Sequence, residues 1–145
     1  MVNVNKCDKE HYDQMYEIHL KSLPINDQMT KQCFYDEFNQ PTRLYFVACL
    51  QEEVVGYIGV FDTIDDYNII GIAVKEEFQR KNIGTLLLQK VIETAKENNV
   101  KSLSLEVDAT NNKAIKFYEK HNFKVTNIRK NYYKNNDALI MWLYL

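Results

Sequence analysis

The sequence Ile72-Ala73-Val74, a short charged turn, and then Gln79-Arg80-Lys81-Asn82-Ile83-Gly84-Thr85 decide the fold of this protein. An apolar run followed by a turn and an amphipathic segment is typical of a strand that leads into a helix. The backbone N–H groups of a helix's first turn lack intrahelical partners and lie at the positive end of its dipole, so they bind anions. This stretch therefore predicts a pyrophosphate site, although a solvated turn with ordinary basic residues is an alternative interpretation. The absence of a Gly-x-x-x-x-Gly-Lys pattern argues against ATP or GTP.

Strands and helices alternate after this stretch. Apolar residues recur three and four residues apart over residues 84–98, which predicts an amphipathic helix. Residues 103–107 alternate between apolar and polar, which predicts a strand with Glu106 on its polar face. We expect further strands at residues 69–74, 123–128 and 138–145, and a further helix at residues 112–121.

The chain before residue 69 predicts an antiparallel region with two helices. An opening strand near residues 2–4 and a hairpin of residues 44–50 and 54–61 are expected from β-branched and aromatic runs. Asp8 is expected to cap a helix that ends at Pro24. A second helix is expected to begin near residue 26 or 27 and to carry Cys33, Phe34 and Phe38 inward.

Composition indicates one domain spanning residues 1–145. The chain has 145 residues with 46% hydrophobic residues, and it contains no linker and no repeat. Its apolar runs are shorter than the ~20 residues of a membrane span, and its first residues do not resemble an export signal, so we expect a cytoplasmic protein. A net charge of −2 argues against direct nucleic-acid binding. The three cysteines form no Cys-x-x-Cys pair, so neither a disulfide framework nor a metal site is expected.

Gln79 to Gly84 resembles the Gln/Arg-x-x-Gly-x-Gly/Ala signature of the GNAT superfamily, the acetyl-coenzyme A dependent N-acetyltransferases. The order of the later segments is similar to the RimI-like branch, the ribosomal-protein alanine N-acetyltransferases. These segments are Leu105-Glu106-Val107, Thr110-Asn111, Ala114-Ile115, Phe117-Tyr118-Glu119-Lys120, Asn122-Phe123, Arg129-Lys130-Asn131-Tyr132-Tyr133 and Asp137-Ala138-Leu139-Ile140-Met141.

The resemblance implies a mixed α/β fold, with a mostly antiparallel sheet of about seven strands and helices on both faces. It also implies acetyl-CoA as co-substrate, inserted where two neighbouring strands diverge. An unpaired strand edge offers main-chain donors and acceptors to an amide-containing ligand, which suits the pantetheine arm. By resemblance, that edge is Ile72, Ala73 and Val74. Arg80, Lys81, Asn82, Ile83, Gly84 and Thr85 would hold the pyrophosphate, and Asn111 would lie near the pantetheine arm.

Two residues match the catalytic positions of the family. Glu106 matches the general base and Tyr118 the residue that protonates the departing thiolate. From the residues alone, the competing interpretations are that Glu106 is a solvent-facing carboxylate and that Tyr118 is a core aromatic. No cysteine lies near either residue in the inferred fold, so direct transfer within a ternary complex is expected.

The resemblance implies a protein N-terminus as the acceptor, specifically that of a basic, alanine-starting ribosomal protein. An α-amine has a pKa of about 7.7 to 8.0, whereas a lysine at about 10.4 needs roughly 3 kcal/mol more to deprotonate. Tyr132 and Tyr133 could form a wall beside the acceptor. Acidic residues that precede the Gln79–Thr85 turn could attract a basic partner if they lie together on one rim of the acceptor site. These residues are Asp62, Asp65, Asp66, Glu76 and Glu77.

The sequence departs from the family pattern at three places: Asn82 concerns the coenzyme site, and the other two leave the acceptor open. Asn82 stands where the signature prefers glycine, although asparagine tolerates left-handed backbone well. Asp108 replaces an arginine, and no Pro-Trp box surrounds Pro24. A lysine, a polyamine or another small amine is an alternative acceptor, and a non-catalytic coenzyme A-binding module is a further alternative. The sequence predicts no oligomeric state.

Overall fold

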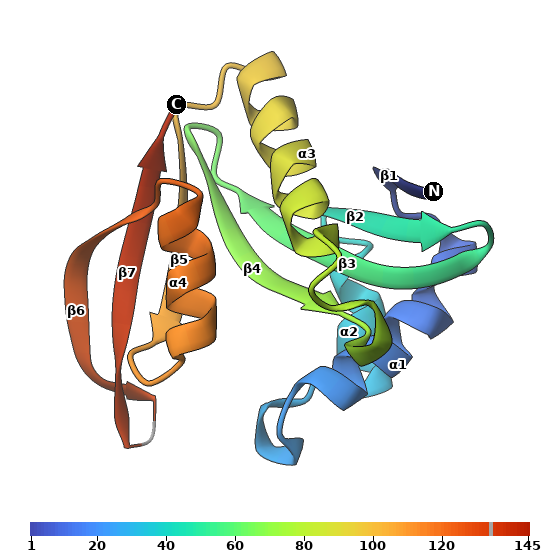
Figure 1. Ribbon diagram of the computed structural model, residues 1–145, viewed down its shortest axis with the longest axis horizontal. Helices are drawn as coiled ribbons and strands as arrows, with labels where there is room; N and C mark the ends of the chain where they lie inside the picture. Colours follow the sequence, from blue (N-terminus) through green and yellow to red (C-terminus); the bar gives the residue numbers. More distant parts are fainter. Residues whose placement is uncertain (134) are drawn as a thin grey trace.

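The computed structural model describes residues 1–133 and 135–145, which form one seven-stranded sheet and four α-helices (Figure 1). The strands are β1 (Val2–Lys6), β2 (Arg43–Leu50), β3 (Glu53–Asp62), β4 (Asp66–Val74), β5 (Ser102–Asp108), β6 (Lys124–Tyr133) and β7 (Asn136–Tyr144). The helices are α1 (Tyr12–Ser22), α2 (Lys31–Glu37), α3 (Ile83–Glu97) and α4 (Asn112–Lys120). In the described part of the chain, no helix is long and apolar enough to cross a membrane.

The strand order is β1-β2-β3-β4-β5-β7-β6, and every neighbouring pair is antiparallel except β4–β5. Helix α3 connects these two parallel strands, as a parallel pair requires a long crossover. The predicted fold class is therefore confirmed. The expected hairpin of β2 and β3 is also confirmed, and Gln51 takes a positive φ of 56° in its turn.

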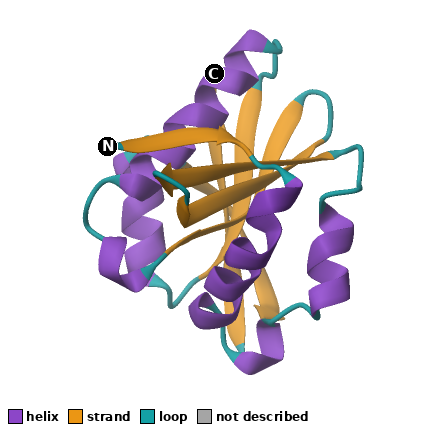
Figure 2. Ribbon diagram, turned by 90° about the vertical axis from the view of Figure 1, so that its right-hand side faces the viewer, coloured by secondary structure: helices purple, strands orange, loops and turns teal. Residues whose placement is uncertain are grey.

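Helices cover both faces of the sheet (Figure 2). Alternate side chains of each strand point to opposite faces, so Phe46 and Ile58 pack with α3, whereas Tyr45 and Tyr57 pack with α1 and α2. The larger apolar core also contains Tyr118 of α4, which therefore lies on the α3 face of the sheet. The sheet thus separates two layers of side chains, and a ligand in a gap between two strands can contact both layers.

Strands β4 and β5 pair over only three residues and then diverge. The pairs are Asp66 with Ser102, Tyr67 with Leu103, and Asn68 with Ser104. The Asp66 carboxylate holds this closed end, because it accepts hydrogen bonds from the hydroxyls of Ser102 at 2.8 Å and Ser104 at 2.6 Å.

A β-bulge lies just beyond the last of these pairs. Gly59 of β3 pairs with Gly71 and Val60 pairs with Ile69, which leaves Ile70 without a partner on β3. A bulge bends the strand that carries it, so β4 turns at the point where it leaves β5. The second half of β4 therefore has a free edge.

The predicted second helix begins later than expected. Residues Ile25–Asp27 form a 3-10 turn, and α2 starts at Lys31 because the Thr30 hydroxyl caps it by accepting from the Cys33 N–H at 3.2 Å. The inward placement of Cys33 is also wrong, since its side chain is exposed. Phe34 and Phe38 are four residues apart and share the inward face, which turns Cys33 outward.

Candidate active site

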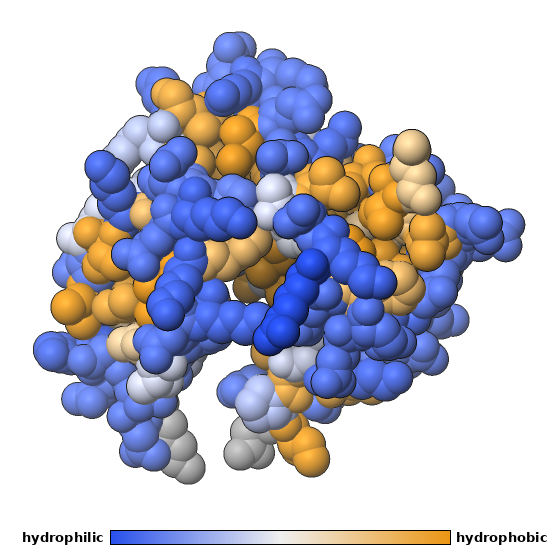
Figure 3. All heavy atoms as spheres, in the orientation of Figure 1, coloured by the Kyte–Doolittle hydropathy of each residue, from blue (hydrophilic) through white to orange (hydrophobic). Residues whose placement is uncertain are grey.

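A cleft of about 940 Å³ lies between the free edge of β4, the start of α3 and helix α4. In the space-filling view its floor is apolar, and hydrophilic side chains extend across its opening (Figure 3). Residues of α1, including Glu17 and Lys21, line one end. Of the predicted coenzyme contacts, all except Lys81 line this cleft. They are Ile72, Ala73, Val74, Arg80, Asn82, Ile83, Gly84, Thr85 and Asn111.

The turn before α3 has the backbone of an anion-binding site. Arg80 and Asn82 both adopt left-handed conformations with φ of 63°, so asparagine takes up the backbone that the signature glycine would allow. Left-handed residues within a turn direct successive N–H groups into one concavity, which suits phosphate oxygens. No side chain caps the N-terminus of α3, so its first N–H groups stay available to a ligand.

Lys81 lies outside the cleft-lining residues. Its ammonium group sits over the ring of Phe78, 5.6 Å from the ring centroid. Its predicted role at the pyrophosphate stays a prediction. Two lysines of α4, Lys113 and Lys120, line the cleft instead, and sequence reasoning did not single them out.

The free edge of β4 supplies the main chain expected to pair with an extended ligand. Ile72, Ala73 and Val74 follow the last residue that pairs with β5. Their opposite edge pairs with β3, so only the cleft side lacks a strand partner. The side chains of Ile72 and Val74 pack against the α3 core, and Ala73 packs on the α1 side. The side chains of these residues thus pack in the core, while their backbone N–H and C=O groups face the cleft.

Glu106 lies on the other face of β5 and does not line the cleft. Val107 and Leu105 beside it point into the core, so the pleat directs Glu106 toward the face that carries α1 and α2. One guanidinium nitrogen of Arg129, from β6, lies 3.3 Å from both of its carboxylate oxygens. The Glu106 side chain is 31% exposed, so this ion pair remains open to solvent.

Tyr118 lines the cleft from the opposite side of the sheet and is only 5% exposed. Burial raises the pKa of Tyr118 above its usual range, so the phenol stays protonated at neutral pH. Its ring packs edge-on against Phe117 and Phe123, which agrees with the core-aromatic interpretation. Within the described residues, its hydroxyl makes no hydrogen bond to protein, so a ligand in the cleft can take its proton.

The loop between β5 and α4 is fixed by two side chains. Asn111 caps α4 by accepting from the Ala114 N–H at 3.2 Å, so it has a structural role besides any contact with a ligand. Asp108 accepts from the backbone and hydroxyl of Thr110 and from the side chain of Asn136 on β7. The Thr110 hydrogen bonds, and then that from Asn136, lower the pKa of Asp108. This residue, which departs from the family pattern, therefore joins the loop to the β6–β7 hairpin.

Tyr132 and Tyr133 form an edge-to-face pair beside Glu106, with ring centroids 5.2 Å apart. Tyr132 is 50% exposed. Burial, and then the negative charge of Glu106, raise the pKa of Tyr133, which indicates that the two side chains lie near each other. The same charge effect reaches Tyr133 from Asp27, in the loop between α1 and α2.

The acidic residues do not share one rim. Asp62 ends β3, Asp65 lies in the turn after it and Asp66 begins β4, whereas Glu76 and Glu77 follow β4, whose nine residues span roughly 26 Å. Asp66 is already engaged by the two buried serine hydroxyls. Of the five, only Glu76 and Glu77 line the cleft. The proposed acidic rim for a basic acceptor is therefore reduced to these two glutamates.

The site therefore combines a parted parallel strand pair, a turn whose backbone suits an anion, and a carboxylate and a phenol on opposite faces of the sheet. These are the groups that an acyltransferase with a phosphate-bearing acyl donor needs. Residues 12–123 match the acetyltransferase (GNAT) family. The chain belongs to this family, so the protein is an acetyl-CoA-dependent N-acetyltransferase.

Individual relatives cover nearly the whole chain. A protein of Bacillus subtilis, provisionally named a ribosomal protein bS18 alanine N-acetyltransferase, is 37% identical in an alignment of 137 residues that covers 92% of this chain and 89% of that protein. An N-alpha-acetyltransferase of Saccharolobus solfataricus is 34% identical in an alignment of 143 residues that covers 89% of this chain and 84% of that protein. The crystal structure of the ribosomal-protein-S18-alanine N-acetyltransferase from Escherichia coli matches with a TM-score of 0.89 and 26% identity, covering 99% and 94% of the two chains.

Proposed function

We propose that this protein transfers an acetyl group from acetyl-CoA to the N-terminal α-amine of an alanine-starting ribosomal protein. The observation that carries the proposal is the gap between β4 and β5, which Glu106 and Tyr118 approach from opposite faces of the sheet. The bacterial relatives support the acceptor, since their names specify the alanine of a ribosomal protein.

Acetyl-CoA binds in the cleft with its pantetheine arm along Ile72, Ala73 and Val74. The free β4 edge favours this placement, because an extended amide ligand can replace the missing strand. The diphosphate lies in the turn before α3, where left-handed Arg80 and Asn82 direct their N–H groups inward. The thioester then lies within the gap, and the adenosine lies toward the opening of the cleft.

Glu106 acts as the general base and accepts a proton from the acceptor's ammonium group, directly or through a water molecule. The neutral nitrogen forms a bond to the thioester carbonyl carbon, and as the carbon–sulfur bond breaks, the nitrogen releases its second proton to water. Tyr118 donates its phenolic proton to the departing sulfur, and the phenol is restored from solvent. Since Glu106 and Tyr118 lie on opposite faces, neither has to serve both the acceptor and the leaving group.

An α-amine suits this site better than a lysine side chain. A reference pKa of about 7.7 to 8.0 leaves an α-amine partly neutral at cytoplasmic pH, whereas a lysine costs roughly 3 kcal/mol more to deprotonate. Tyr132 and Tyr133 stand beside Glu106 and can flank a peptide backbone on the acceptor side. A lysine or small-amine acceptor remains the competing hypothesis.

The test is acetylation of two matched peptides, followed by mass spectrometry. The first has a free alanine at its N-terminus and arginine in place of every lysine. The second has a blocked N-terminus and one internal lysine. We expect acetyl-CoA to be consumed with the first peptide only. Acetylation of the second alone would establish a lysine acceptor, and tight acetyl-CoA binding with transfer to neither peptide, a polyamine or a cell lysate would favour a non-catalytic module.

Direct transfer is tested separately by mixing enzyme and acetyl-CoA without acceptor. We expect the intact mass of the protein to stay unchanged. A covalent gain of one acetyl group that is then passed on to an added peptide would contradict a ternary mechanism.

A further inference from the structure

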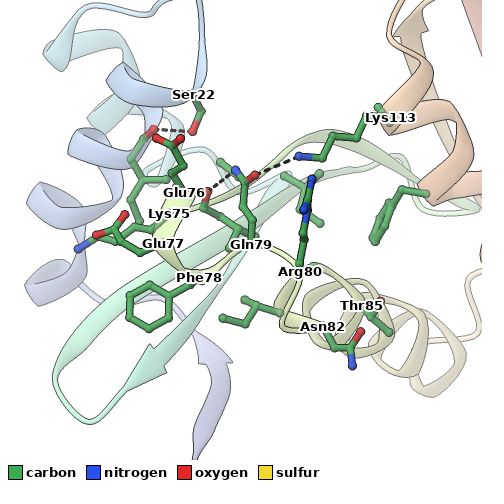
Figure 4. Close-up of a pocket in the computed structure, with 18 of the residues that line it drawn as sticks. Ser22, Lys75, Glu76, Glu77, Phe78, Gln79, Arg80, Asn82, Thr85 and Lys113 are labelled. Carbon is green, nitrogen blue, oxygen red and sulfur yellow. Dashed lines mark hydrogen bonds between the residues drawn. The ribbon is translucent and has the colours of Figure 1, made fainter.

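Gln79 and Lys113 bridge the opening of the cleft. The Lys113 ammonium group, on the first turn of α4, donates to the Gln79 side-chain oxygen at 3.0 Å. The amide nitrogen of Gln79 donates in turn to the backbone oxygen of Val74 at 3.2 Å. Figure 4 shows Lys113 extending from α4 toward Gln79, with Arg80 beside them. The bridge connects the two walls of the cleft over the turn that precedes α3.

The positive charge of Lys113 has no carboxylate partner among the described residues. Six ion pairs occur in that part of the chain, and none includes Lys113 or Arg80. Lys75, near the same opening, differs, because its ammonium lies 2.9 Å from the carboxylate of Glu53. A neutral amide stabilises an ammonium group less than an anion does. Lys113 is therefore positioned, with its charge uncompensated, where a phosphate would arrive.

We propose that Lys113 binds the coenzyme diphosphate by exchanging the amide oxygen of Gln79 for a phosphate oxygen. The proposal rests on the proposed function, and it adds a side chain of α4 to the residues that bind the phosphates. Lys113 then supplies the basic side chain that Lys81, placed over Phe78, does not direct into the cleft. Its ammonium donates to the anion from the side opposite the N–H groups of the turn.

The diphosphate, and not the 3′-phosphate of the ribose, is the group that this geometry favours. Gln79 is the first residue of the turn whose left-handed residues, Arg80 and Asn82, form the anion-binding concavity. The Lys113 nitrogen already lies within hydrogen-bonding distance of that turn. A charge–phosphate contact of this kind changes affinity by about tenfold.

The test is calorimetric titration of wild type, Lys113→Ala, Lys113→Arg and Lys116→Ala with three ligands. Lys116 is a matched control, because it is exposed on the same helix but does not line the cleft. The ligands are acetyl-CoA, its 3′-dephospho form and acetyl-pantetheine, which lacks all of the phosphates of the ADP end. We expect Lys113→Ala to weaken the first two by about tenfold and to leave the third unchanged. Lys113→Arg should restore most of the affinity, and Lys116→Ala should match wild type.

Three outcomes would overturn the assignment. They are an unchanged affinity of Lys113→Ala for acetyl-CoA, a loss confined to the ligand that carries the 3′-phosphate, and an equal loss with acetyl-pantetheine. Thermal melting of each variant checks that the fold is intact. If wild type itself binds no acetyl-CoA, the proposed function fails, whereas normal wild-type binding with an unaffected Lys113→Ala refutes only the role of Lys113.

Discussion

Asn82 adopts a left-handed backbone conformation, with φ of 63°, in the turn before α3. A residue with a Cβ and no local hydrogen-bonding side chain pays about 1 kcal/mol or more for this conformation. We therefore expect Asn82→Ala to lose about 1 kcal/mol of unfolding free energy, whereas Asn82→Gly should lose none. Denaturant titration of both variants measures the difference. Equal stability of the alanine and glycine variants would show that the backbone is not held in this conformation.

A substitution of Glu106 should slow acetyl transfer without weakening the binding of acetyl-CoA. Glu106→Gln keeps the shape of the side chain but cannot accept the ammonium proton. We expect kcat to fall by roughly 10² to 10⁴, with the affinity for acetyl-CoA near that of wild type. Glu119→Gln, at an exposed position on α4, is the matched control and should keep full activity. A fully active Glu106→Gln enzyme would mean that Glu106 is only the ion-pair partner of Arg129.

Tyr118 has two possible roles that one substitution separates. Tyr118→Phe keeps the ring that packs against Phe123 and removes only the proton donor. If the phenol protonates the thiolate, kcat should fall by about 10² or more while the melting temperature stays within a few degrees of wild type. Normal turnover in this variant would leave the core-aromatic interpretation as the whole account of Tyr118. Steady-state kinetics and calorimetry together measure both effects.

Among the elements, β4 and β5 carry the feature that creates the cleft, and Asp66 fixes where their pairing begins. Asp66→Ala would leave the buried hydroxyls of Ser102 and Ser104 without their acceptor. We expect the variant to lose about 2 to 3 kcal/mol of unfolding free energy. The exposed neighbour Asp65→Ala should change stability by less than about 0.5 kcal/mol. Similar losses in the two variants, measured by urea denaturation, would contradict this role of Asp66.

Helices and strands with a long and regular spacing of apolar residues were predicted more accurately than those without one. Helix α3 was predicted to within one residue at each end, because its apolar spacing is long and regular. The second helix was misplaced, since the cap at Thr30 and the 3-10 turn before it involve short-range hydrogen bonds that periodicity does not reveal. Ser104 was predicted on a polar face, yet it is buried because Asp66 and Asn68 of the neighbouring strand cover it with hydrogen bonds.

At the scale of the whole molecule, His19 joins three parts of the fold and makes stability depend on pH. Its Nε2 accepts from the Met29 N–H at 2.9 Å, and its other ring nitrogen lies 3.4 Å from the Tyr57 hydroxyl. This residue is 4% exposed, and burial lowers its pKa below the usual 6.5. The unfolded chain therefore binds a proton at a pH where the folded protein does not. The stabilisation is complete above about pH 6.5 and is lost as the pH falls toward the lowered pKa.

We expect the melting temperature to fall between pH 7 and pH 5, and to fall less in His19→Gln. His121 contributes in the same direction, because burial and the charge of Lys120 also lower its pKa. His121→Gln alone should therefore reduce the fall in melting temperature between pH 7 and pH 5 by a separate amount. A pH dependence in His19→Gln that equals that of wild type would show that the contact with Met29 does not depend on an unprotonated ring.

The sequence by itself determined the strand and helix order, because this depends on periodicity and on residue types at short spacings. Its resemblance to the GNAT superfamily supplied the coenzyme role of the turn before α3 and the candidate acid and base. Only the tertiary structure decided which of these residues meet. The divergence of β4 and β5 depends on a bulge at Ile70 and on hydrogen bonds between residues 36 and 38 positions apart. The placement of Glu106 and Tyr118 on opposite faces, the reach of Lys113 to Gln79 and the separation of the acidic residues are likewise set by packing between distant segments, which no local pattern encodes.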